Sequence, residues 1–216
     1  MLRLGIIAVA AASLAGAAAA ADLPVKAPPA AAPVFLPFTW TGPYAGASAG
    51  FGWSSGGGLD GSGGFGGGQI GYNVQTGNLV FGVEGDIAGA GISQSLTGTA
   101  GGLPFTSTFN TDTLASLRGR AGVAANSWLF YGTFGAGFAN GTGSGTSGAG
   151  NPFSNNEWLS GWTAGAGVEW SIAPNWSTKL EYLHYGLGAP NSFGNPVPAG
   201  KVDIDTLKIG INYLFR

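Results

Sequence analysis

Apolar and polar residues alternate along most of the chain after its first forty residues. The pattern is clearest in the last stretch, where the apolar positions are Ile209, Ile211, Tyr213 and Phe215. A period of two is typical of a strand with one apolar and one polar face. The same alternation predicts eight strands, over residues 44–53, 65–75, 79–89, 112–124, 128–139, 158–170, 176–185 and 203–215.

The lengths and connections of these strands indicate a membrane protein. Each predicted strand has about 10 to 13 residues, enough to cross a bilayer obliquely, whereas soluble strands average about 5–6. Short turns at 75–78, 125–127 and 171–175 alternate with longer loops rich in Gly, Ser, Asn and Pro at 54–64, 90–111, 140–157 and 186–202. In transmembrane barrels the short turns face the periplasm and the long loops face outside. The sequence therefore predicts an all-β fold, an eight-stranded antiparallel transmembrane up-and-down β-barrel with both termini in the periplasm.

Charged residues make up only 8% of the chain, far below the roughly 25% of soluble domains. Eight of them fall within the predicted strands, all on the face opposite the apolar one: Glu84, Asp86, Arg118, Arg120, Glu169, Lys179, Glu181 and Lys208. A Lys or Arg facing lipid at mid-bilayer costs roughly 2–4 kcal/mol. These residues should therefore face the lumen, where four acids can pair with four bases. Three further acids, Asp112, Asp203 and Asp205, begin strands beside long loops and are expected above the membrane.

A lumen of about eight strands is narrow enough to be filled by side chains, whereas open porins need about 16–18 strands. We therefore expect a plugged interior held by a network of paired charges. The alternative is a continuous aqueous pore, in which the same charges would conduct or gate ions.

Aromatic residues gather near both ends of the predicted strands. Near the turn ends lie Trp40, Tyr44, Tyr72, Trp128, Phe130, Trp170, Trp176, Tyr213 and Phe215, and near the loop ends lie Trp53, Phe138, Trp158, Trp162 and Tyr182. Two such belts are typical of the interfacial girdles of membrane barrels. The alternative is the core of a soluble β-sandwich, which shares part of this composition.

The N-terminal region is predicted to lie outside the barrel. Residues 1–21 have the features of a signal peptide: Arg3, an apolar run over residues 4–14, and small residues before the cleavage site. An uncleaved anchor helix is the alternative. Residues 22–38 are rich in Pro and Ala, which favours an extended periplasmic linker. Residues 39–216 then form the barrel, and the protein is expected in the outer membrane of a Gram-negative cell.

Several kinds of chemistry find no support in the sequence. A net charge of −2 gives no basic footprint for nucleic acid. There is no Cys, and no cluster of His and carboxylates has metal-ligand spacing, so we expect no metal or other cofactor. The single His, His184, has the outward parity of its strand near the loop end, where an interfacial position is expected. No catalytic set of nucleophile and base is visible, so no enzyme is expected.

Six short motifs that recur in order carry a family resemblance: residues 38–44 (FTWTGPY), 68–73 (GQIGYN), 81–86 (FGVEGD), 118–122 (RGRAG), 165–170 (GAGVEW) and 179–182 (KLEY). Together with the expected signal peptide, they resemble the small outer-membrane β-barrel proteins of alpha-proteobacteria, often called outer membrane immunogenic proteins or surface-antigen-like porin-family proteins. The resemblance covers nearly all of residues 38–215. It implies an eight-stranded barrel like the membrane domain of OmpA, and an abundant envelope protein and surface antigen rather than an enzyme.

The resemblance also implies partners. Lipid and lipopolysaccharide of the outer membrane should surround the barrel. In this class the closing strand, with Ile209, Ile211, Tyr213 and Phe215, is the signal read by the barrel-assembly machinery, although here Arg216 follows the terminal aromatic residue. Some relatives are attached to peptidoglycan through a mature Ala-Asp N-terminus, which Ala21-Asp22 would match if cleavage follows Ala20. The expected function is structural support of the envelope, and the alternative is a small diffusion pore or ligand receptor.

Overall fold

The structure, a computed structural model, describes residues 38–55, 60–100, 102–146, 152–188 and 202–216. The expected signal peptide and almost all of the expected linker therefore lie outside the described residues. Within the described ranges the chain forms eight strands: β1 (Gly42–Ser55), β2 (Asp60–Thr76), β3 (Leu79–Ala100), β4 (Leu103–Ala125), β5 (Trp128–Thr146), β6 (Pro152–Ala173), β7 (Trp176–Leu187) and β8 (Val202–Leu214). A search of the same residues for a helix long and apolar enough to cross a membrane found none.

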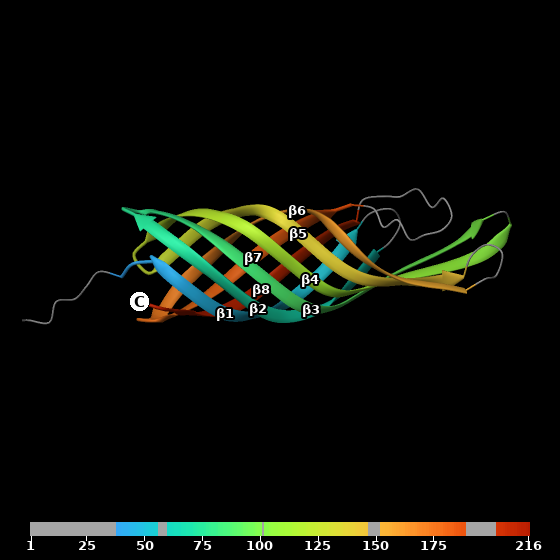
Figure 1. The fold of residues 1–216 in the computed structure, drawn as a ribbon, viewed down its shortest axis with the longest axis horizontal. Helices are drawn as coiled ribbons and strands as arrows, with labels where there is room; N and C mark the ends of the chain where they lie inside the picture. Colours follow the sequence, from blue (N-terminus) through green and yellow to red (C-terminus); the bar gives the residue numbers. More distant parts are fainter. Residues whose placement is uncertain (1–37, 56–59, 101, 147–151, 189–201) are drawn as a thin grey trace, which may run out of the picture. The chain divides into compact units, whose positions relative to one another are not determined.

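The strands close into an antiparallel barrel. Each strand pairs with the next along the chain, and β8 returns to pair with β1 (Figure 1). The closing seam runs from Tyr44↔Leu214 to Ser55↔Asp203 without a register shift. These pairings confirm the predicted fold class.

The alternation in the sequence is also an alternation between the two sides of the wall. On the closing strand Ile209 is 62% exposed, whereas its neighbours Lys208 and Gly210 are buried. Leu117 on β4 and Phe134 on β5 are likewise exposed on the outside. Because side chains of one parity leave the barrel and those of the other enter it, the outer surface is apolar and the lumen is polar over the middle of the strands.

The three short turns lie where the sequence predicts them. At the tips of the first two turns, Gly77 and Asn126 have φ of 60° and 55°. Both values are in the left-handed region, which Gly adopts without strain and Asn tolerates better than other residues.

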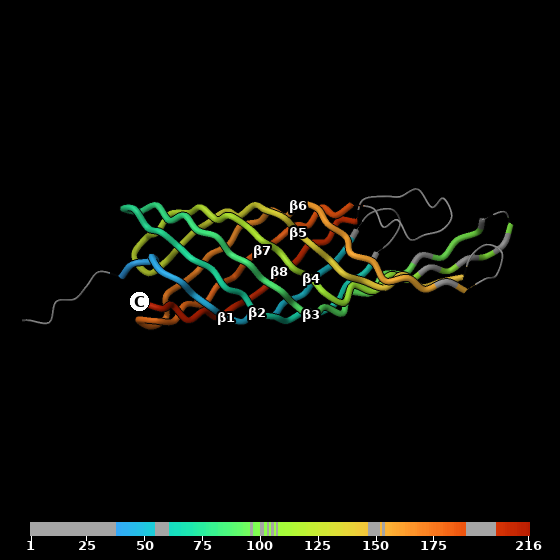
Figure 2. Tube along the Cα trace, viewed as in Figure 1, coloured from blue at the N-terminus to red at the C-terminus, as the bar shows by residue number. Residues whose placement is uncertain are grey.

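The predicted long loops at 90–111 and 140–157 are wrong. Strand β3 continues to Ala100 and pairs with β4 as far as the register Ala100↔Leu103, and β5 and β6 pair as far as Thr146↔Pro152 (Figure 2). The expected loop at 54–64 is also shortened, since β1 ends at Ser55 and β2 begins at Asp60. In these segments hydroxyl and amide side chains alternate with small or apolar ones, so the period of two is present. The outer face is polar, however, and the prediction of strands relied on an apolar outer face. Most of the fourth predicted loop, residues 189–201, lies outside the described residues.

The added length forms a four-stranded extension of the barrel wall, here called the projecting sheet (residues 92–100, 103–112, 140–146 and 152–158). The last pairs of its strands with the flanking β2 and β7 are Asp60↔Ser95 and Gly161↔Leu187, and only the four strands continue beyond them. Residues directly opposite each other in a ladder point to the same face. The outward positions form a hydroxyl–amide face: Ser93, Ser95, Thr97, Thr99, Thr106, Thr108, Asn110, Asn140, Thr142, Ser144, Thr146, Ser154 and Asn156.

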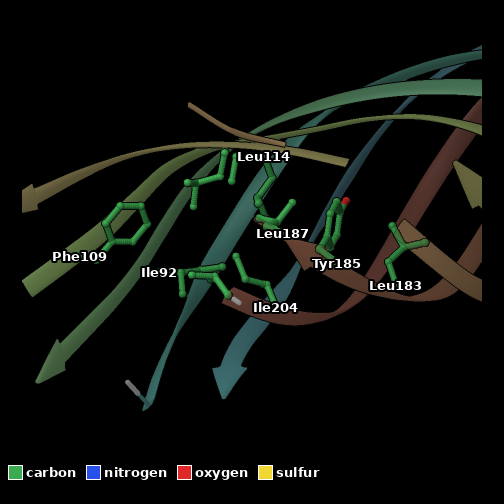
Figure 3. Close-up of a cluster of buried hydrophobic side chains, with 10 residues drawn as sticks. Ile92, Phe109, Leu114, Leu183, Tyr185, Leu187 and Ile204 are labelled. Atoms are coloured by element: carbon green, nitrogen blue, oxygen red, sulfur yellow. The ribbon is translucent and has the colours of Figure 1, made fainter. Parts of the chain in front are cut away.

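Two apolar clusters fill the two ends of the lumen. The loop-end cluster consists of Ile92, Phe109, Leu114, Ala139, Leu159, Leu183, Tyr185, Leu187, Val202 and Ile204 (Figure 3). The turn-end cluster consists of Trp40, Val80, Ala124, Leu129 and Tyr131, with Phe38 packed against it. The eight charged lumen residues share the inward parity and lie on the turn side of the loop-end cluster. The buried polar residues Gln94 and Thr111 lie at the level of that cluster or beyond it.

The assignment of Trp40 and Tyr44 to the aromatic girdle is wrong. Their exposed fractions are 1% and 2%, because both side chains enter the lumen. Trp40 precedes β1 and packs edge-to-face against Phe38, with ring centroids 4.9 Å apart. The other residues assigned to the two belts are exposed on the outer surface, for example Trp128 and Trp170, which stack at 5.3 Å.

Candidate functional site

The eight charged residues predicted to face the lumen meet there as one layer of ion pairs. Arg118 on β4 is its centre. Its Nη2 atom donates to Glu84 and Asp86, each at 2.7 Å, and its Nη1 atom donates to Glu181 at 3.1 Å. Its Nε atom donates to the Ser116 hydroxyl at 2.7 Å. One guanidinium thus binds three carboxylates that come from β3 and from β7, on the other side of the lumen.

Glu84 on β3 has three cations within 4 Å, as Glu181 on β7 does. Lys179 Nζ lies 2.7 Å from both carboxylate oxygens, and Arg120 Nη1 lies 3.6 Å from Oε2. The Tyr44 hydroxyl donates to Oε2 at 2.7 Å. Burial of this carboxylate is therefore compensated by charges from β4 and β7 and by a neutral donor from β1.

Lys208 on β8 completes the layer beside Glu181. Its Nζ lies 3.0 Å from Glu181 Oε2 and 3.7 Å from Asp86 Oδ2. The contact with Glu181 is an ion pair outside the geometry of a directed hydrogen bond. Lys179 Nζ lies 3.9 Å from the same Oε2 atom, so two ammonium groups share this carboxylate.

Glu169 on β6 extends the layer toward the turn end. It accepts from Arg120 Nη2 at 2.7 Å, from the Ser177 hydroxyl at 2.5 Å and from Asn212 Nδ2 at 2.9 Å. The Asn212 oxygen in turn accepts from Gln69 Nε2 on β2 at 2.8 Å. With Gln69 included, hydrogen bonds and ion pairs connect polar side chains from seven strands. Tyr131 adds the eighth strand, β5.

Two tyrosines, Tyr44 and Tyr131, also belong to the layer. Neither was predicted from the sequence as an interior residue. The Tyr131 hydroxyl donates to Glu181 at 3.1 Å, and the Arg120 guanidinium carbon lies 4.0 Å from the centre of the Tyr131 ring. Arg120 also donates to the Tyr44 hydroxyl at 2.9 Å. Both tyrosines have lumen parity, which was the available signal.

Glycines opposite these tyrosines make the room they need. A Cβ on Gly71 would lie 2.3 Å from Cζ and Oη of Tyr44, and one on Gly167 would lie 2.6 Å from the same atoms of Tyr131. Such distances are far shorter than any van der Waals contact. The rings therefore lie against the inner wall, and their hydroxyls reach the charges at the centre.

The layer is electrically neutral and its central side chains are fully buried. Four acids face four bases, and the side chains of Arg118 and Lys179 are 0% exposed. Removing any one charge would leave a buried partner uncompensated. The arrangement is suited to holding eight strands together across a narrow lumen. In the described ranges, no group of three or more His, Cys, Asp and Glu side chains could hold a metal ion.

His184 lies apart from this layer, on the outward side of β7 near the loop end. Its Nδ1 atom lies 2.8 Å from Asp205 and its Nε2 atom 3.9 Å from Asp203. The Tyr182 hydroxyl donates to Asp205 at 2.5 Å, and the His184 ring lies 5.1 Å from that of Trp162. His184 thus has the predicted outward parity near the loop end, with the two acids beside it. The interfacial place of His184 and the place of the two acids above the membrane stay predictions.

Comparison with known proteins identifies relatives of the whole chain. A family model described as "Outer membrane protein beta-barrel domain" matches residues 7–215. The 31 kDa outer-membrane immunogenic protein of Brucella melitensis is 36% identical over 97% of this chain and 98% of its own length. The 25 kDa outer-membrane immunogenic protein of Brucella abortus is 31% identical over 91% of this chain and 90% of its own length. Among solved structures, the outer membrane protein OprG of Pseudomonas aeruginosa is 14% identical, with a TM-score of 0.47 over 82% of this chain and 97% of OprG.

Proposed function

This chain belongs to the outer membrane protein β-barrel family, and we propose that it is a structural barrel that supports the envelope, with its lumen closed by paired charges. Location in the outer membrane and likeness to surface antigens follow from the family and its Brucella members. The closed lumen and the contribution to envelope integrity are the new parts of this assignment.

One observation carries the proposal: Arg118 is fully buried and binds three carboxylates across the lumen. A hydrated ion crossing the barrel would have to separate these pairs. Breaking a buried ion pair by removing one partner costs about 3–5 kcal/mol. The apolar clusters toward both ends of the lumen are unfavourable surroundings for a hydrated ion, which also supports a plugged barrel.

Conductance of the purified full-length protein in planar bilayers tests the closed lumen. We expect no stable openings for the wild-type protein, and openings for a variant with Arg118→Ala, which removes the central cation and much of its volume. A matched control is Leu117→Ala, the adjacent outward residue, which should stay closed. Large, stable wild-type openings would instead favour the small diffusion pore or receptor.

A deletion strain separates the structural role from a transport role. Loss of a structural barrel should raise sensitivity to detergent and leave the uptake of small solutes unchanged. Reduced uptake with normal detergent resistance would contradict the proposal. Restoring the wild-type gene in the same strain is the control.

Two partners follow from the same assignment. The closing strand with Phe215 would be read by the assembly machinery during folding, and in the finished barrel the Arg216 guanidinium carbon lies 3.9 Å from the centre of the Phe38 ring. Attachment to peptidoglycan through Ala21-Asp22, outside the described residues, would appear as murein-bound N-terminal peptides in mass spectrometry. Finding only free N-termini would remove that attachment. We expect no catalytic activity, since the sequence offers no visible set of nucleophile and base.

A further inference from the structure

The outward side of the projecting sheet continues the wall that faces lipid. On β5 the outward residues change from Phe134 and Phe138 to Asn140 and Thr142, and the change occurs near the level where β6 leaves β7. In the outer leaflet of a Gram-negative outer membrane, the sugars of lipopolysaccharide lie directly above the hydrocarbon. The hydroxyl–amide face therefore stands at the height of those sugars.

The chemistry of this face suits neutral sugars and does not suit phosphates. Among the outward residues of the projecting sheet whose side chains the structure describes, Asp112 is charged and the others are neutral. The described cations are elsewhere: Arg118, Arg120, Lys179 and Lys208 in the lumen, and Arg216 beyond the turn end of β8. A surface that meets only water usually has about 25–35% charged residues. Hydroxyls and amides both donate and accept hydrogen bonds, as sugar hydroxyls do.

Part of the face is already ordered by its own hydrogen bonds. Asn140 and Asn156 exchange amide hydrogen bonds at 2.9 and 3.2 Å, and the Thr142 hydroxyl donates to Asp112 at 3.3 Å. The register shift between Thr111 and Thr113 adds one residue to β4, and this bulge places Asp112 on the outward side. Asn140 Nδ2 also donates to the Glu157 carbonyl at 3.3 Å, and Asn156 Nδ2 to the Thr142 hydroxyl at 3.5 Å. The amide oxygens keep acceptor capacity for sugar hydroxyls, with little orientational freedom to lose on binding.

An exposed aromatic ring adjoins these groups. Trp158 is directly opposite Asn140 in the ladder between β5 and β6 and is 62% exposed. A broad aromatic face beside fixed hydrogen-bonding groups can stack on the C–H face of a sugar ring while the amides bind its hydroxyls. We call Asp112, Asn140, Thr142, Asn156 and Trp158 the Asn–Trp patch.

We propose that the Asn–Trp patch binds the core oligosaccharide of the lipopolysaccharide molecules that surround the barrel. The neutral sugars hydrogen-bond to the amides and hydroxyls and stack on Trp158. Because no described cation takes part, the contact should depend little on salt concentration. This inference rests on the outer-membrane location and is independent of whether the lumen is closed, so a conducting barrel would leave it intact.

The test compares two lipopolysaccharides with the purified full-length protein in detergent. One has the complete core, and the other has lipid A with only its innermost sugars. Two lost hydrogen bonds to sugar hydroxyls correspond to roughly a tenfold change in affinity, so the wild-type protein should prefer the complete core by about that factor. The variant Thr142→Val with Asn156→Val should lose the preference, since Val keeps the β-branching that suits a strand but removes the hydrogen-bonding groups.

A matched control is Thr76→Val, at the turn end of β2, which should keep the wild-type preference. Heat-dependent gel mobility checks folding of every variant, and Asn156→Thr alone serves if the double variant does not fold. Equal wild-type affinity for the two lipopolysaccharides would overturn the proposal, as would a double variant that keeps the preference. Competition by soluble dextran as effective as by the free core would also overturn it, because the face would then bind sugars without regard to their source.

Discussion

Replacing Arg118 by Met should destabilise the barrel more than any other single loss of charge in the lumen. Met keeps a long apolar side chain but removes the donors to Glu84, Asp86 and Glu181. Hydrogen bonds to charged groups contribute about 1.5–3 kcal/mol each, and three of them would sum to roughly twice the cost measured for breaking buried pairs. The simple sum is too large here, because Lys179 and Lys208 remain beside Glu84 and Glu181. We therefore expect a loss of about 3–5 kcal/mol.

The Asp86 carboxylate should account for most of that cost. Without Arg118, its only cation within 4 Å among the described residues is Lys208, at 3.7 Å. The lumen would hold four acids and three bases, a net charge of −1. Adding Asp86→Asn restores neutrality, so the double variant should recover at least about 1 kcal/mol relative to Arg118→Met alone, as expected for residues in one network.

The assay is urea unfolding in lipid vesicles, followed by Trp fluorescence and by gel mobility of unheated samples. Leu117→Met, on the outward side of the same strand, is the control and should change the free energy of unfolding by less than about 0.5 kcal/mol. The reasoning would be refuted by a loss below about 1 kcal/mol for Arg118→Met together with no recovery in the double variant. The charges would then be solvated by water, and a hydrated pore would replace the plug.

Three further substitutions test the inner wall, the outer wall and the turn-end closure. Gly71→Ala should cost about 1–3 kcal/mol, because its Cβ meets the Tyr44 ring at 2.3 Å. Gly68→Ala is the control, since its Cβ finds nothing nearer than 3.6 Å, and equal costs in urea unfolding would contradict this account of the inner wall. Ile209→Lys on the lipid face should cost roughly 2–4 kcal/mol in the same assay, and a neutral result would place this strand outside the bilayer. Trp40→Ala should cost about 3–5 kcal/mol without opening a conducting path, since the ion-pair layer remains; stable single-channel openings in planar bilayers would show that the turn-end cluster is the barrier.

The elements found from sequence are those in which side-chain parity is enforced by lipid. Ile209 and Leu117 had to be apolar because they leave the barrel in the bilayer, so the period of two was visible. Beyond the bilayer that constraint ends. Segments such as Thr97–Thr99 and Thr142–Ser144 keep strand geometry with polar outward residues, and they were expected to be loops. Their pairing depends on a neighbouring strand, which composition does not reveal.

Interior partners were harder to predict than interior charges. The parity of Arg118 and Glu84 indicated that they enter the lumen, and neutrality indicated that they pair. The pairing of particular acids with particular bases depends on the stagger of the strands and on how far side chains extend across the barrel. Both are properties of the closed fold. Trp40 was misplaced because it precedes the first strand and turns into the lumen to join the turn-end cluster.

Part of the high glycine content follows from packing large side chains against the inner wall of so narrow a barrel. Gly accounts for 42 of 216 residues. On the inner wall, a Cβ at Gly50 would lie 2.7 Å from the Phe65 ring, and one at Gly137 would lie 2.8 Å from the Tyr185 ring. These aromatic rings therefore lie over positions of the inner wall that have no side chain. Gly weakens a strand by about 0.5–1 kcal/mol relative to Ala, whereas a fully buried aromatic side chain contributes about 1.5–3 kcal/mol. The exchange favours stability, and it agrees with the plugged lumen that we propose.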